Sequence, residues 1–116
     1  MPLSLGLRDE ENERINNILN KLMELVYVPD GWLNDNTQSL LAQLGLSAES
    51  LDAMTGYELT LHVSKMHFDW ANMERLADML AANPAFKDKA VALYNFVQTE
   101  SKMFSFDIFN KINALK

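Results

Sequence analysis

The fold is decided by residues 69–104, which read DWANMERLADMLAANPAFKDKAVALYNFVQTESKMF. Apolar side chains recur every three or four positions on both sides of Asn83-Pro84, the pattern of two amphipathic helices. Asp69 suits the N-cap of the first helix, because its carboxylate can accept a hydrogen bond from a free amide of the first turn. A residue before proline is disfavoured in the α conformation, whereas Pro84 suits the first turn of the next helix. Residues 69–104 are therefore predicted to form an antiparallel helical hairpin.

Length and composition place this hairpin in a larger helical fold. The chain has 116 residues, 48% of them hydrophobic, with only four glycines and three prolines. That length is enough for one hydrophobic core and too short for two domains. We therefore expect a single domain over residues 1–116, an all-α compact bundle of five to six helices with the hairpin in its C-terminal half. Residues 1–8 are expected to form a loose N-terminal arm.

Composition also narrows the function. The chain contains no cysteine, which excludes disulfides, cysteine nucleophiles and thiolate metal sites and fits a reducing cytoplasm. Residues 1–60 hold ten acidic side chains against three basic ones, and the whole chain has a net charge of −6 without a basic stripe. Such a chain repels phosphate backbones, so no nucleic-acid partner is expected. No apolar run reaches the length of a membrane span, so we expect a cytoplasmic protein with no membrane partner.

The first predicted helix opens at Asp9 and carries a clean apolar stripe. Two interpretations are open. In the preferred one the stripe packs within its own domain; in the other it forms a self-association seam across a two-fold axis. The asparagines at 12, 16, 17 and 20 are interpreted as a solvated polar face. The interface candidates on the stripe are Ile15, Ile18, Leu22 and Leu25.

Three further aromatic positions are interface candidates. Pro29-Asp30-Gly31 is typical of a turn, and Trp32 after it can either plug the core or act as an exposed binding anchor. Near the C-terminus, Ser105 favours a helix break and a new N-terminus. Without that break the last helix would project and expose its aromatics, with Phe106 and Phe109 as interface candidates.

Motifs that carry chemistry are scarce. Thr55 to Glu58 reads as a capping box. Glu58, His62, His67 and Asp69 could be imagined as a zinc or iron site, because imidazole and carboxylates are common ligands of both metals. However, no HExxH motif and no second ExxH motif is present, and no serine lies on a glycine-rich elbow. We therefore expect no enzyme activity, no catalytic residue and no cofactor.

The hairpin resembles a single tetratricopeptide-type helical pair. The resemblance rests on Leu76-Ala77 with Leu80 in the first arm, and on Ala90, Tyr94 and Val97 in the second. The turn carries Asn-Pro, the closing proline is absent and no second copy follows at the repeat period, which excludes a repeat array. The C-terminal segment is also similar to the ends of small uncharacterised bacterial all-helical proteins with such a hairpin. The resemblance implies a binding scaffold and nominates no catalytic residue.

Together these observations predict a non-enzymatic protein-interaction module or helical adaptor. Its partner would be another protein or a second copy of the chain, with affinity from apolar surface and selectivity from the acidic N-terminal half. The alternative is a small-ligand or metal-binding protein that uses the cluster of Glu58, His62, His67 and Asp69.

Overall fold

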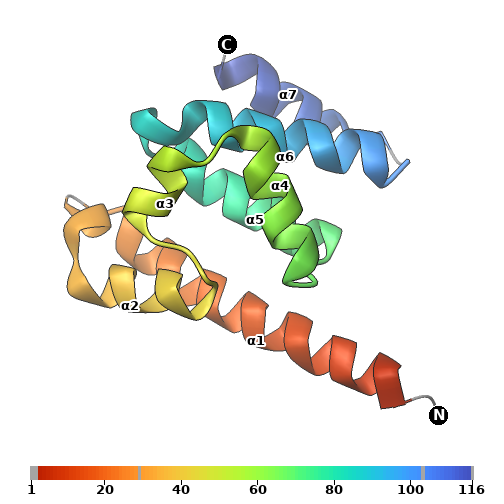
Figure 1. Cartoon of the computed structure of the whole chain (residues 1–116). Helices are drawn as coiled ribbons and strands as arrows, with labels where there is room; N and C mark the ends of the chain where they lie inside the picture. Colours follow the sequence, from red (N-terminus) through yellow and green to blue (C-terminus); the bar gives the residue numbers. More distant parts are fainter. Residues whose placement is uncertain (1–2, 29, 103, 116) are drawn as a thin grey trace.

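The computed structural model describes residues 3–28, 30–102 and 104–115, with side chains from Glu10 onward. Within these ranges the chain forms seven α-helices and two 3-10 helices and has no β-strand, which confirms the all-α fold (Figure 1). In chain order the helices are α1 (Leu3–Val26), η1 (Gly31–Leu33), α2 (Asp35–Gln43), α3 (Ala48–Ala53), α4 (Gly56–Lys65), α5 (Trp70–Ala81), η2 (Pro84–Phe86), α6 (Lys87–Glu100) and α7 (Phe106–Leu115).

The predicted hairpin lies at the centre of the fold. α5 and α6 form the most extensive helix pair; α5 also contacts α1, and α6 also contacts α4 and α7. The side chain of Asp69 accepts a hydrogen bond from the amide of Asn72 at 2.7 Å, as expected for the N-cap of α5. At the turn, the side chain of Asn83 accepts a bond from the amide of Ala85 at 3.0 Å. Buried apolar residues of all seven α-helices therefore form one core around the hairpin.

The start of α1 differs from the expected loose arm. The helix begins at Leu3, six residues before the predicted start at Asp9, and its first turns extend beyond the other helices in Figure 1. Adding a residue to an existing helix costs much less than nucleating a new one. Residues 3–8 therefore continue α1, although the acidic run at Asp9 suggested a boundary.

The predicted break near Ser105 is confirmed. α6 ends at Glu100 and α7 begins at Phe106, while Lys102 between them has a left-handed backbone with φ 59°. The side chain of Gln98 holds the new N-terminus, because its Oε1 accepts from the amide of Ser105 at 2.8 Å and its Nε2 donates to the carbonyl of Ser105 at 3.0 Å. α7 therefore folds back onto α6.

The short helix α4 has the local signal that was expected of it. Thr55 and Glu58 form a reciprocal capping box on α4, with hydrogen bonds of 2.9 and 3.1 Å. Ser47 and Ser50 form a second capping box, on α3, which was not among the predicted signals. Because that segment is helical, the count of α-helices reaches seven instead of five to six.

Candidate functional site

The four residues of the imagined metal cluster have separate structural roles. Glu58 closes the capping box of α4, and Asp69 caps α5. His62 Nε2 lies 3.0 Å from the carbonyl oxygen of Leu44, and His67 occupies a left-handed position, φ 66°, after α4. No group of three or more His, Cys, Asp or Glu residues in the described chain is arranged to hold a metal ion. These four side chains thus do not form the predicted cluster.

The apolar stripe of α1 faces the interior of its own chain. Ile15, Ile18 and Leu22 are buried in the core, and Leu25 is half-buried. Their removal from solvent confirms the preferred interpretation of the stripe. The self-association seam is wrong for Ile15, Ile18 and Leu22, because these side chains are already covered by the rest of the molecule.

Asn12, Asn16 and Asn20 of α1 face α5, which corrects their interpretation as a solvated face, whereas Asn17 is exposed as that interpretation expects. The backbone carbonyl of Asn12 accepts a hydrogen bond from the Asn72 side chain at 3.1 Å. Nη1 of Arg75 donates to the side chains of Asn16 and Asn20, the latter at 2.7 Å. The polar side of α1 is therefore bonded to α5 along about two helical turns, next to the apolar seam between the same helices.

A polar network ties α7 to the hairpin. Tyr94, which is only 1% exposed, donates its hydroxyl proton to the carboxylate of Asp78. Nζ of Lys111 bonds Glu74 Oε2 at 2.6 Å and lies 3.0 Å from Asp78 Oδ1. Tyr27 at the end of α1 donates to the backbone carbonyl of Asp78 at 3.3 Å. The network thus joins α1, α5, α6 and α7, and its groups are satisfied by one another.

Stability should fall at alkaline pH because of this network. Burial, followed by the hydrogen bond to the Asp78 carboxylate, raises the pKa of Tyr94 above its ordinary value of about 10. Above pH 10 an unfolded tyrosine loses its proton while folded Tyr94 keeps it, so the free energy of unfolding falls by up to about 1.4 kcal/mol per pH unit. Urea unfolding between pH 8 and 11 measures this slope.

Two neighbours act in the same direction. Burial raises the pKa of Tyr27. Burial lowers the pKa of Lys111, but the hydrogen bonds to Glu74 and Asp78, together with the charges of these carboxylates, raise it overall. Each proton is held more tightly in the folded chain, so its contribution is also lost as the pH rises. In the variant Tyr94→Phe, the free energy of unfolding should therefore still fall with rising pH, but less steeply. The slope should decrease by the contribution of about one proton. An unchanged slope would contradict the assignment to Tyr94.

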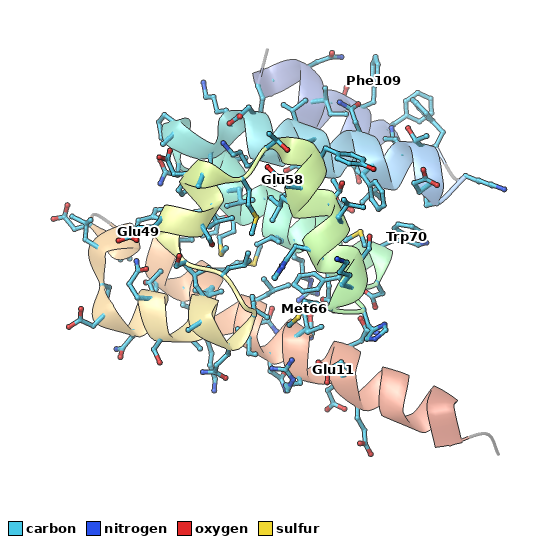
Figure 2. All side chains as sticks on the ribbon, viewed as in Figure 1. Glu11, Glu49, Glu58, Met66, Trp70 and Phe109 are labelled. Carbon is cyan, nitrogen blue, oxygen red and sulfur yellow. The ribbon has the colours of Figure 1, made fainter. Side chains whose placement is uncertain are left out.

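Three phenylalanines gather on the surface where α6 turns into α7. The exposed fractions are 63% for Phe104, 75% for Phe106 and 46% for Phe109. The ring centroid of Phe104 lies 4.9 Å from that of Phe106 and 5.9 Å from that of Phe109. Figure 2 shows Phe109 directed outward from α7. These three residues, named here the phenylalanine cluster, include two of the predicted interface residues.

A shallow apolar groove lies between α4 and α6. Its volume is about 340 Å³. Gly56 makes the close approach of the two helices possible, because a Cβ there would lie 2.4 Å from the Cβ of Ala92. At the groove's edge the ring of Phe96 contacts the ring of half-exposed Trp70, with centroids 6.1 Å apart. The groove is lined by Tyr57, Thr60, Ala92, Asn95, Phe96, Thr99 and Glu100.

The predicted Trp32 anchor lies in a second depression, named here the Trp32 pocket, with a volume of about 450 Å³. The indole packs edge-on against buried Phe86, with centroids 5.3 Å apart, as a plug would. Leu33 beside it is 79% exposed, as an anchor would be. Trp32 Nε1 is buried without a hydrogen-bond partner, the one such side-chain atom in the described chain. Trp32 is thus placed as the plug interpretation expects, and its role as a binding anchor stays a prediction.

Comparison with protein-family models, curated proteins and solved structures finds no match for this chain. The resemblance of the hairpin to a tetratricopeptide-type pair thus stays a prediction, although the six residues on which it rests are buried along α5 and α6. None of the described helices combines the length and hydropathy of a membrane span.

Proposed function

We propose that this protein is a non-enzymatic protein-interaction module and that the phenylalanine cluster is its docking surface. The observation that carries the proposal is the exposure of Phe104, Phe106 and Phe109 at one corner of the fold. Ile108 and Ile112 are buried on the inner side of α7, so Phe106 and Phe109 stand on a packed helix, with Phe104 beside them in the connection from α6. Aromatic side chains, phenylalanine among them, are enriched in the cores of protein–protein interfaces.

The area of the cluster supports an interface that extends beyond it. At their measured exposure the three side chains offer roughly 300–450 Å² of accessible surface. This area equals the largest apolar patch of a typical monomer, which is often functional. A stable interface buries about 800 Å² on each partner, so the partner must also cover neighbouring surface. The α4–α6 groove, which includes Thr99 and Glu100 at the end of α6, offers such surface.

The partner is a helical protein or a second copy of this chain. Two helices packed through phenylalanines bury the rings in each other's grooves, and a two-fold dimer would bring two clusters together. The proposal includes that the protein is a scaffold of tetratricopeptide type in the bacterial cytoplasm. Helical hairpins of this type bind partners through exposed faces. The absence of cysteine and the net charge of −6 are compatible with that location.

The double variant Phe106→Asp/Phe109→Asp tests the docking surface. Two charges in a desolvated contact should weaken association at least a hundredfold, because each anchor contributes about 2 kcal/mol or more. Both residues lie on the outer side of α7, so far-UV circular dichroism should remain that of the native fold. Light scattering over a hundredfold range of concentration, together with a pull-down from the native host, measures association.

Leu61→Asp is the matched control, because Leu61 is also an exposed apolar helix residue but lies on α4, outside the cluster. It should associate as the wild type does. A double variant with the mass and the captured partners of the wild type would refute the docking surface. A wild-type chain that stays monomeric and captures nothing would refute the function itself.

A further inference from the structure

The Trp32 pocket lies at the opposite end of α6 from the phenylalanine cluster. It includes Asn83 and Pro84, which precede α6, whereas Phe104 follows α6. α6 has 14 residues, so about 20 Å of helix separates the two surfaces. Figure 1 shows the same separation, with η1 at the left of the view and the connection from α6 to α7 at the right. One small partner segment does not cover both.

The lining of the pocket combines apolar side chains with polar groups, Asp30 and Asn83 among them. Tyr27, Val28 and Leu33 are more than half exposed, while Trp32 rests on Phe86. Apolar side chains gathered around a depression in this way suit one or two anchor residues of a bound segment. The depression is lined by Val26, Tyr27, Val28, Asp30, Gly31, Trp32, Leu33, Ala82, Asn83 and Pro84.

Trp32 also offers an unsatisfied donor. Its buried Nε1–H has no acceptor among the residues that the structure describes, a state that costs about 1–3 kcal/mol. After a small rotation of the indole, a backbone carbonyl of a bound segment can accept this proton and remove that cost.

Negative charge surrounds the pocket. Asp30 lines it, and Glu24 and Asp35 are exposed on the adjoining ends of α1 and α2. α1 ends at Val26 without a basic residue in its last turn, so the negative end of its dipole is not compensated there. The charge of Lys111 reaches Tyr27, but Lys111 is paired with Glu74 and Asp78. Lys21 lies more than a turn back along α1, and Lys87 lies at the start of α6. A cation is therefore favoured at the mouth and an anion is repelled.

We propose that the Trp32 pocket binds a peptide segment of another protein that presents apolar side chains next to a lysine or arginine. The apolar side chains fill the space among Val28, Trp32 and Leu33, and the cation lies over Asp30 and the end of α1. The inference rests on the proposed function only for the class of partner, since it uses a different surface and different residues.

A pair of synthetic amphipathic helices tests the proposal, one of leucine and lysine and one of leucine and glutamate, each of about 18 residues. The chain has two tryptophans, so nuclear magnetic resonance of the indole N–H groups gives two signals, which Trp70→Phe assigns. The leucine–lysine peptide should shift the Trp32 signal, leave the Trp70 signal in place and bind at least tenfold more tightly than the leucine–glutamate peptide.

Variants locate the site and its charge. Leu33→Ser should weaken binding of the leucine–lysine peptide about tenfold; because Leu33 is exposed, the fold should be unaffected. Asp30→Asn should weaken it severalfold at low salt, and asparagine tolerates the left-handed backbone of this position, φ 61°. Phe106→Asp should leave it unchanged, so a failure of the phenylalanine cluster as a docking surface does not affect this test.

Several results would overturn the inference. Equal affinity for the two peptides would show that charge does not select the partner. Unchanged affinity in Leu33→Ser would show that the peptide does not bind in the Trp32 pocket. A shift of the Trp70 signal instead of the Trp32 signal would place binding elsewhere. No binding of the leucine–lysine peptide at millimolar concentration would exclude the site altogether.

Discussion

Gly31→Ala should destabilise the protein by about 3–4 kcal/mol, near the upper end for a single substitution. A Cβ at this position would lie 1.7 Å from the carbonyl oxygen and 2.7 Å from the carbonyl carbon of Leu25. Both are backbone atoms of the last turn of α1, so no change of rotamer relieves the clash. The connection around Gly31 must move away from α1 and carry Trp32 with it. Urea unfolding monitored by circular dichroism measures the loss of stability.

Gly45→Ala is the matched control for this prediction. It makes the same chemical change at a position with φ 71°, where the nearest atoms are side-chain atoms of His62 at 3.1 Å. The left-handed backbone should cost about 1–2 kcal/mol, and His62 can shift by a few tenths of an ångström. The effect of alanine on the unfolded chain is similar at both sites. A loss at Gly31 no larger than the loss at Gly45 would mean that the connection does not press against α1.

Local hydrogen-bonding chemistry explains why the helix boundaries could be predicted. Asp69, Thr55 with Glu58, and Ser105 each satisfy amides within three residues of themselves, so the signal lies entirely in a short stretch of sequence. The turn before Trp32 was expected from the residue types Pro29-Asp30-Gly31, which favour turn conformations. Its dependence on Gly31 was not, because the clash is with a backbone that only the folded chain brings close.

Helical periodicity identifies a face but not what covers it. The stripe through Ile15 and Ile18 has the same spacing whether its partner is α5 or a second copy, and burial within the chain decides between them. The sequence does not show whether Asn16 and Asn20 are hydrated or bonded to Arg75, because a polar helix face can contact water or another polar side chain. Long-range pairing of this kind leaves no local signal in a single sequence.

The candidate docking residues show the same limit. Phe104 ends the predicted hairpin of residues 69–104, whose helical periodicity does not show that this side chain is exposed. Exposure of Phe106 and Phe109 was tied to an unbroken helix, but the helix breaks and they are exposed nonetheless. The reason is that α7 is apolar on two sides, with Ile108 and Ile112 against α6 and the phenylalanines outside.

Asp78→Ala should destabilise the protein by about 1–3 kcal/mol at neutral pH. The buried hydroxyl of Tyr94 loses its acceptor, and an unsatisfied buried group costs about 1–3 kcal/mol. Lys111 loses one of its two carboxylates, which adds about 0.5 kcal/mol at a partly exposed site. The higher helix propensity of alanine offsets a similar amount. Urea unfolding gives the free energy.

A double-mutant cycle with Tyr94→Phe separates the hydrogen bond from the ion pair. Tyr94→Phe alone should cost about 1 kcal/mol, because the Asp78 carboxylate keeps Lys111 as a partner. Once the hydroxyl is gone, Asp78→Ala leaves no unsatisfied donor, so the double variant should cost about 1–2 kcal/mol less than the two single losses together. Additive losses would mean that Tyr94 does not depend on Asp78 for its acceptor.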